Sequence, residues 1–201
     1  MPAPIEFYFD FSSPYAYLAS EKIEALAARH GREVKFKPIL LGAVFKVTGG
    51  APLTEGVTAK GAYSVHDFAR SARFQGTPFT LPNPFPIATV TAARAMLWLT
   101  REQPAHAASF MHAVFRAYFA DGRNISEPAV LTELVRECGL DAERVLAGAA
   151  EPQIKDQLKA QVEGAIVRGV FGAPFMFVDG EAFWGHDRLP QIDRWLATGG
   201  F

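Results

Sequence analysis

Residues 5–19 read IEFYFDFSSPYAYLA, and this stretch decides the fold. Its first half is rich in aromatic residues and places every second side chain on one apolar face, which predicts a strand. Apolar residues then recur at helical spacing as far as Gly31, and Ser13 followed by Pro14 is typical of a helix start. Because residues 34–41 read as a second strand, this part of the chain predicts a βαβ unit with a parallel pair.

The middle of the chain has a different pattern. Residues 42–86 are rich in glycine and proline and predict loops with one short helix over residues 63–74. Helical periodicity is almost continuous from Thr89 to Ala150, and we find no strand pattern there. An all-helical block is therefore expected to follow the βαβ unit.

The C-terminal part returns to mixed structure. A long helix is expected after Pro152, followed by strands over residues 174–178 and 182–184. The Asp179-Gly180 pair between these strands is a strong hairpin signal, and residues 187–196 predict a closing helix. The order of elements indicates a small α/β domain that is interrupted by an all-helical insertion.

Composition and charge narrow the function classes. The chain has 201 residues and a formal net charge of -1, so neither a nucleic-acid partner nor a charged membrane surface is indicated. The single cysteine, Cys138, excludes an internal disulfide and a CxxC redox pair. The N-terminus lacks the basic region of a secretory signal, and no apolar run approaches the roughly 20 residues of a membrane span. We therefore expect a cytoplasmic protein, and no Cys/His cluster predicts a metal site.

The first candidate site is the turn around Ser12 and Ser13. It lies between the end of a strand and the start of a helix, where unpaired N–H groups and the helix dipole favour an anion. A thiolate at such a place is stabilised. The alternative is that Ser13 and Pro14 simply cap the helix. A serine hydrolase is not indicated, because the chain has no G-x-S-x-G motif.

Two further stretches are candidates. Pro174 is either an ordinary edge-strand residue or a cis-proline, in which case Ala173 would present its backbone to an extended peptide. Asp187 either caps the last helix and pairs with Arg188 or binds an ammonium group. His186 is either a loop histidine or a base that titrates near neutral pH. In a thioredoxin-type sheet, these stretches and the first turn converge on one end of the domain.

The chain resembles the 2-hydroxychromene-2-carboxylate isomerase family and its relatives, the kappa-class glutathione transferases. Four stretches carry the resemblance, the last of them more weakly: residues 9–19 (FDFSSPYAYLA), 171–174 (FGAP), 184–189 (WGHDRL) and 59–63 (AKGAY). The resemblance implies an α/β fold in which a thioredoxin-like domain is interrupted by an all-helical insertion. The corresponding division is residues 1–43 with 152–201 for the first and residues 44–151 for the second.

The resemblance also implies a glutathione site. Ser13 would donate a hydrogen bond to the glutathione sulfur, and Ala173 before Pro174 would pair its backbone with the cysteinyl part. Lys60 would lie near the cofactor, and Asn83 would face the organic substrate. The γ-glutamyl end would be held by Trp184, Gly185, His186 and Asp187. The chain departs from the family at residues 87–89, where the family often carries an asparagine.

The implied reaction is isomerisation of a hydroxylated aromatic acid by reversible addition of the glutathione thiolate, within aromatic-compound catabolism and in a homodimer. A serine in place of a cysteine cannot form a mixed disulfide, but it can stabilise a thiolate that a ligand supplies. Two alternatives stay open. A kappa-like transferase would release the glutathione adduct, and a non-catalytic thioredoxin-like module would bind peptides beside Pro174.

Overall fold

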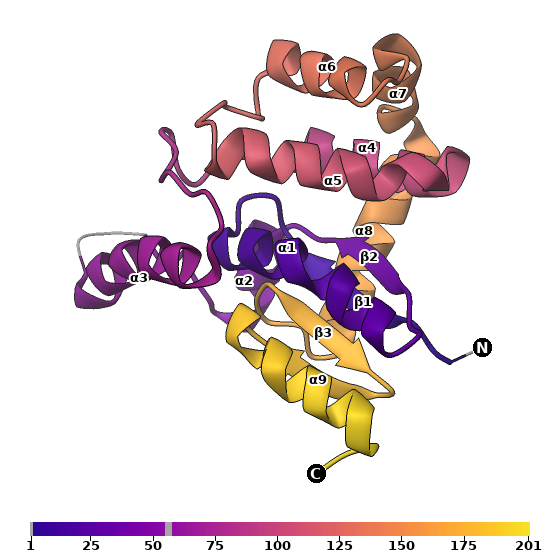
Figure 1. The fold of residues 1–201 in the computed structure, drawn as a ribbon. Coiled ribbons are helices and arrows are strands. Elements are labelled where there is room, and N and C mark those ends of the chain that lie inside the picture. The colour runs from indigo at the N-terminus through magenta and orange to yellow at the C-terminus, as the bar shows by residue number, and fades with distance from the viewer. Residues whose placement is uncertain (1, 55–57) are drawn as a thin grey trace.

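A four-stranded sheet in the order β2-β1-β3-β4 forms the centre of the molecule (Figure 1). The computed structural model describes residues 2–54 and 58–201. The strands are β1 (Ile5–Phe9), β2 (Val34–Pro38), β3 (Phe175–Val178) and β4 (Glu181–Trp184). β1 pairs in parallel with β2 and antiparallel with β3, so the two ends of the chain meet in one sheet.

The predicted βαβ unit is present, with α1 (Pro14–Arg29) between its strands. Ser13 is the N-cap of α1, and its hydroxyl accepts a hydrogen bond from Ala16 N. Ile5, Phe7 and Phe9 are fully buried, as the alternating pattern requires. The first strand was predicted to reach Phe11 but ends at Phe9, because the chain turns at the following aspartate.

Two helices, rather than one, occupy the segment that was predicted to be mainly loop. They are α2 (Leu41–Thr48) and α3 (Ala59–Gln75). α3 extends the predicted helix at its N-terminal end, where Thr58 accepts a hydrogen bond from Gly61 N (2.9 Å). The short α2 was missed because it carries Gly42 in its first turn and lacks a side-chain cap.

The predicted helical block contains α4 (Val90–Glu102), α5 (Pro104–Phe119), α6 (Pro128–Glu137) and α7 (Ala142–Ala149). These helices stack above the sheet in Figure 1, with α6 and α7 farthest from it. Phe115 on α5 packs against both Phe9 and Phe11 at ring distances of 5.6 and 5.0 Å. This aromatic contact joins the helical block to the sheet.

The C-terminal part begins with α8 (Pro152–Val167) and continues into the β3–β4 hairpin. Asp179 and Gly180 both have positive φ angles, 52° and 91°, which a two-residue type I′ turn requires. The last helix was predicted to start at Asp187. Instead, a 3-10 turn, η1 (His186–Arg188), precedes α9 (Leu189–Thr198).

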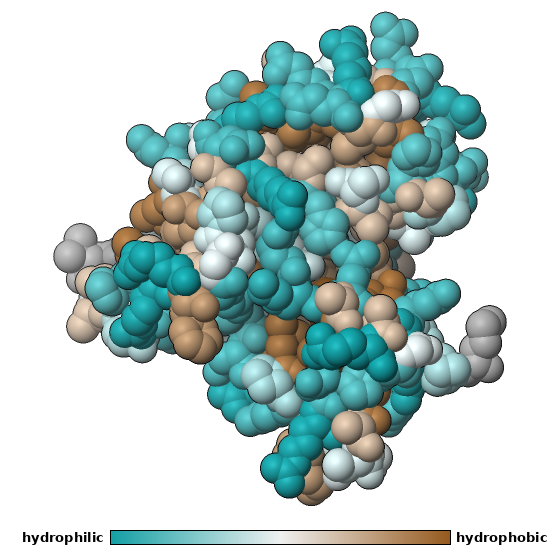
Figure 2. Space-filling view, in the orientation of Figure 1, coloured by the Kyte–Doolittle hydropathy of each residue, from teal (hydrophilic) through white to brown (hydrophobic). Residues whose placement is uncertain are grey.

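α1 and α9 lie on one face of the sheet and α8 crosses the other (Figure 1). Polar residues dominate the face of the molecule in Figure 2, and apolar residues gather there only in small separate patches. Within the described ranges, no helix has the length and apolar character that crossing a bilayer requires. The division into a thioredoxin-like domain and a helical insertion at residues 43/44 and 151/152 stays a prediction. Across the second of these boundaries, α8 contacts both α4 and β2.

Candidate functional site

The Ser13 hydroxyl links the first predicted motif to the second. Ser13 is buried and its Oγ donates to Ala173 O at 3.1 Å while accepting from Ala16 N at 3.2 Å. The two bonded residues are 160 positions apart in the sequence. Ser12 points elsewhere, because its Oγ accepts from Ile87 N at 3.2 Å. The structure therefore separates the roles of the two neighbouring serines.

Two N–H groups, one at this turn and one in the Ala173 loop, have no hydrogen-bond acceptor in the described part of the chain. Tyr15 N occupies the second position of α1, where no carbonyl of the helix can reach it, and Ala173 N also lacks a protein acceptor. Ser13 N is not available, because it donates to Asp10 O at 2.9 Å. The start of α1 thus offers one N–H donor and one hydroxyl at its positive end, and the Ala173 loop to which that hydroxyl is bonded offers a second N–H; this combination suits an anion.

Asp10 holds this turn in place, and sequence reasoning gave it no role. Its buried carboxylate accepts hydrogen bonds from Ser12 N (2.9 Å), Leu41 N (2.7 Å) and Thr89 Oγ1 (2.7 Å). Burial raises the pKa of Asp10, although the three donors oppose that effect. The available signal was an acidic residue in an otherwise aromatic stretch, directly after a buried strand.

The second and third motifs meet at the loop before β3. The Ala173-Pro174 peptide bond is cis, the second of the two alternatives considered for Pro174, and Pro174 O accepts from Gly185 N at 3.0 Å. Trp184 closes over Gly172 so tightly that an added Cβ would lie 2.6 Å from the indole Nε1. Glycine is therefore needed at this position, since any side chain would displace the indole.

His186 completes the site by stacking on Tyr15. The two rings are 4.8 Å apart and almost parallel, with an interplanar angle of 5°. Burial lowers the pKa of His186, while the carboxylates of Asp187 and Asp67 act in the opposite direction. Contacts now run from Ser13 through Ala173-Pro174 and Gly185 to His186, and back through Tyr15 to α1. The three stretches that the sequence singled out form one closed ring of contacts.

Three predicted site residues lie outside this ring. Asp187 is exposed and pairs with Arg188 at 2.7 Å; it caps neither η1 nor α9, so capping is the wrong explanation for it. Lys60 is exposed at the start of α3, and Asn83 is exposed in the loop before α4. That loop nevertheless returns to the site, because Ile87 N binds Ser12 Oγ.

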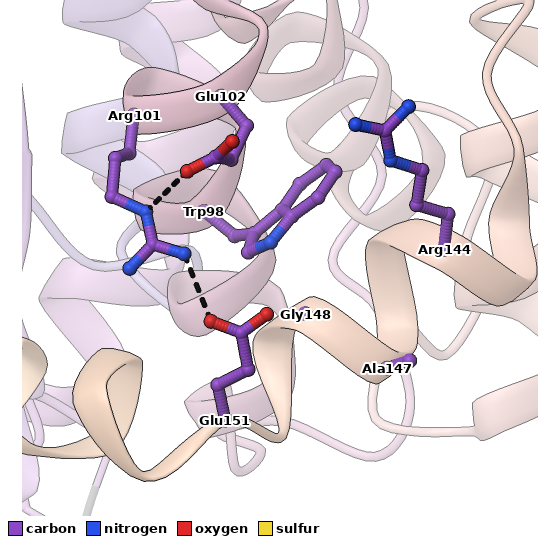
Figure 3. Close-up of a pocket in the computed structure, with 7 residues that line it drawn as sticks. All are labelled: Trp98, Arg101, Glu102, Arg144, Ala147, Gly148 and Glu151. Atoms are coloured by element: carbon purple, nitrogen blue, oxygen red, sulfur yellow. Dashed lines mark hydrogen bonds and ion pairs between the residues drawn. The ribbon is translucent and has the colours of Figure 1, made fainter.

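The hollow drawn in Figure 3 belongs to the helical block and includes none of the predicted site residues. Its volume is about 490 Å³, and it lies where α4 faces α7. Arg101 bridges Glu102 and Glu151 across it, and the Arg144 guanidinium lies 5.7 Å above the Trp98 ring. The Arg144–Trp98 contact joins α7 to α4, and the Arg101–Glu151 ion pair joins α4 to the residue that precedes α8. Within the described residues, no group of three or more His, Cys, Asp or Glu side chains is arranged so that it could hold a metal ion.

Comparisons with known proteins cover nearly the whole chain. The model of the DSBA-like thioredoxin domain family matches residues 4–197. The 2-hydroxychromene-2-carboxylate isomerase of Sphingobium xenophagum is 32% identical over 98% of this chain and 99% of its own length. Glutathione S-transferase kappa 2 of Caenorhabditis elegans is 25% identical over 96% of this chain and 91% of its own. A solved 2-hydroxychromene-2-carboxylate isomerase superposes with a TM-score of 0.84 at 27% identity, covering 96% of this chain and 94% of that one.

Proposed function

The chain belongs to the family of DSBA-like thioredoxin domains and, within it, to the 2-hydroxychromene-2-carboxylate isomerase family, and on this basis we propose that it is a glutathione-dependent isomerase. Its substrate is a hydroxylated aromatic acid of the chromene-carboxylate type, and its place is aromatic-compound catabolism in a reducing cytoplasm. The observation that carries the proposal is the hydrogen bond between Ser13 Oγ and Ala173 O. It sets a hydroxyl, in place of a thiol, at the junction of the anion-binding turn and the Ala173-Pro174 loop.

The donors at this turn fit a thiolate. Ser13 can turn its hydroxyl hydrogen from Ala173 O towards a sulfur atom, and Tyr15 N and Ala173 N are the further donors beside it. The positive end of α1 adds a favourable field for negative charge. Redox exchange does not fit, because Cys138 lies in the helical block at the end of α6, where burial raises the pKa of its thiol.

When bound, glutathione supplies a thiolate that adds to a conjugated carbon of the substrate and leaves after the former double bond has rotated. Ser13 holds the sulfur by a hydrogen bond that is strongest while the sulfur carries charge. It therefore favours ionisation of the thiol and its later departure as an anion. Ala173 N orients the cysteinyl part from the opposite side of the turn.

The remaining site residues have roles in the same proposal. Trp184, Gly185, His186 and Asp187 hold the γ-glutamyl end, and the exposed Asp187 carboxylate receives its ammonium group. Lys60 lies seven residues before Asp67, hence on the same side of α3, and reaches the cofactor from there. Asn83 faces the organic substrate from the loop whose Ile87 N donates to Ser12 Oγ.

The second candidate is a kappa-like glutathione transferase, which the similarity to the nematode kappa 2 enzyme favours. The two activities share the same thiolate site and differ in the fate of the adduct. An isomerase regenerates glutathione, whereas a transferase consumes one molecule for each molecule of substrate. Measuring free thiol during turnover of a chromene-carboxylate substrate separates them.

Ser13→Ala tests the thiolate site, with Ser12→Ala as its matched control. Removing the Ser13 hydroxyl deletes one hydrogen bond to a charged sulfur, worth roughly 1.5–3 kcal/mol, or about ten- to a hundredfold in rate. The ultraviolet absorbance of the thiolate, followed against pH, should show a higher pKa for bound glutathione in Ser13→Ala. Ser12→Ala should leave that pKa unchanged, since Ser12 Oγ is engaged by Ile87 N. The thiolate assignment fails if Ser13→Ala leaves the titration where it was.

A further inference from the structure

Tyr15 of α1 is held by groups on two other elements, α3 and η1. Its hydroxyl donates to Asp67 Oδ2 on α3 at 2.6 Å, and its ring packs edge-on against buried Phe68 at 5.0 Å. The His186 imidazole of η1 stacks on the same ring. The two carboxylate oxygens of Asp67 have different partners. Arg70 donates to Oδ1, and the Tyr15 hydroxyl donates to Oδ2. The Asp67 side chain is only 17% exposed, so this bond is largely shielded from water.

The orientation of His186 depends on this arrangement. Its ring nitrogens have no hydrogen-bond partner among the described residues, so the stack on Tyr15 is the contact that orients the imidazole. η1 itself is a single 3-10 turn that lacks a side-chain cap. A ring without its hydroxyl bond can pivot about its side-chain torsions, and the imidazole that stacks on it then loses a fixed support.

We propose that Asp67 is a positioning residue that acts through the Tyr15 hydroxyl to fix His186 and, with it, the turn that recognises the γ-glutamyl end of glutathione. The contacts Asp67–Tyr15–His186 are called the α3 latch below. The latch extends the site to a helix that contributes no group to the thiolate turn itself. Its effect on ligand recognition rests on the glutathione-dependent function proposed above.

Binding of glutathione by calorimetry tests the latch with Tyr15→Phe, Asp67→Ala and the double variant. Each single variant should raise the Kd for glutathione by about three- to tenfold. This loss corresponds to roughly half of the free energy of a hydrogen bond to a charged group. The double variant should bind no more weakly than either single one, because both changes break the same bond. The rate of Asp67→Ala at saturating glutathione should stay within about twofold of the native rate, as expected for lost binding in the ground state.

Asp193→Ala is the matched control. The Asp193 carboxylate accepts hydrogen bonds from His30 at 2.7 Å and from Arg29 at 3.1 Å. Like Asp67, it is therefore a carboxylate paired with an arginine, but it lies away from the site. Its removal should leave the Kd for glutathione unchanged. Tyr15→Phe also guards against a folding artefact, since it keeps the Asp67–Arg70 pair on α3 intact. A loss confined to Asp67→Ala, absent from Tyr15→Phe, overturns the latch.

The NMR signals of the His186 ring protons supply a readout that needs no ligand. These protons lie over the Tyr15 ring, so its ring current should shift them upfield in the native chain. Both latch variants should move the signals towards their ordinary positions, and Asp193→Ala should not. Unchanged His186 signals in both latch variants refute the proposal. If the native chain binds no glutathione, the proposed function fails, and the His186 signals still decide whether the latch exists.

Discussion

Asp10 shows how much of the site depends on a single side chain. Its carboxylate binds the turn of Ser13 through Ser12 N, the start of α2 through Leu41 N and the start of α4 through Thr89 Oγ1. The carboxylate is buried, and the three bonds replace the water that it loses on folding. One residue thus sets the relative positions of three segments that are far apart in the chain.

Asp10→Asn should destabilise the protein by about 1–3 kcal/mol, because the amide NH2 must face a backbone N–H or a hydroxyl donor. Urea unfolding followed by circular dichroism measures the loss. Thr89→Val is the control, because it removes only one of the three donors to Asp10. It should lower the free energy of unfolding by less than Asp10→Asn does. Equal stability of Asp10→Asn and the native chain would contradict this account of the turn.

At the scale of elements, an ionic cluster joins α1 to α5. His112 of α5 contacts Glu24 at 2.5 Å and Glu21 at 3.6 Å, and Arg116 binds Glu21 at 2.7 Å. Burial of the imidazole opposes its protonation, but the two carboxylates outweigh burial and raise the pKa of His112 to about 9. Burial likewise disfavours the charged form of Glu21, but His112 and Arg116 outweigh it and lower the pKa of Glu21 to about 2.

The stability of the native chain should fall as the pH rises from neutral through about 9, the pKa of His112 in the folded state. The folded protein binds the His112 proton more tightly than the unfolded chain does. The contribution of this proton to the free energy of unfolding is therefore complete below pH 6.5 and is lost above pH 9. After allowance for partial exposure, it amounts to about 1–2 kcal/mol. Urea unfolding at several pH values measures it.

His112→Gln should remove this pH-dependent part, whereas His106→Gln, at an exposed position of the same helix, should retain it. A native chain with the same stability at pH 7 and pH 10 would show that the α1–α5 cluster does not contribute in this way. At the opposite end of the range, the contribution of Glu21 is complete above its ordinary pKa and is lost as the pH falls towards 2.

At the scale of the whole molecule, the site is assembled from both ends of the chain. The turn of Ser13 precedes α1, while Ala173 and His186 flank the hairpin near the C-terminus. β1 and β3 pair side by side, and this pairing brings the two ends together at one edge of the site. A ligand held between them therefore contacts segments that separate when the domain unfolds. The homodimer that the family resemblance implies stays a prediction.

Glutathione should consequently stabilise the whole chain against heat. At about 100 times its Kd, a ligand of the folded state adds about 2.7 kcal/mol to the free energy of unfolding. S-methylglutathione should add clearly less, because its sulfur cannot become an anion for Ser13 to bind. Thermal unfolding with each compound measures the difference. Equal stabilisation by the two would show that the site does not recognise a thiolate.

Much of the fold follows from short-range patterns. The period of two in residues 5–9 and the Asp179-Gly180 pair predict a strand and a hairpin turn, and both are present. Ser13 before Pro14 predicts the start of α1, and the cap is confirmed by the bond to Ala16 N. These features are readable because each depends on residues within one turn or one strand of each other.

The contacts that bring the site residues together depend on tertiary structure. Ser13 meets Ala173 across 160 positions, and Leu41 N, at the start of the missed helix α2, binds a carboxylate 31 positions earlier. Asp67 was not singled out because nothing near it in the sequence indicates that its partner is Tyr15. By itself the sequence determined most of the elements, the hairpin and the serine at the start of α1. Only the folded chain decided which distant groups face one another, because hydrogen bonds and ring stacks form between neighbours in space whatever their separation in the chain.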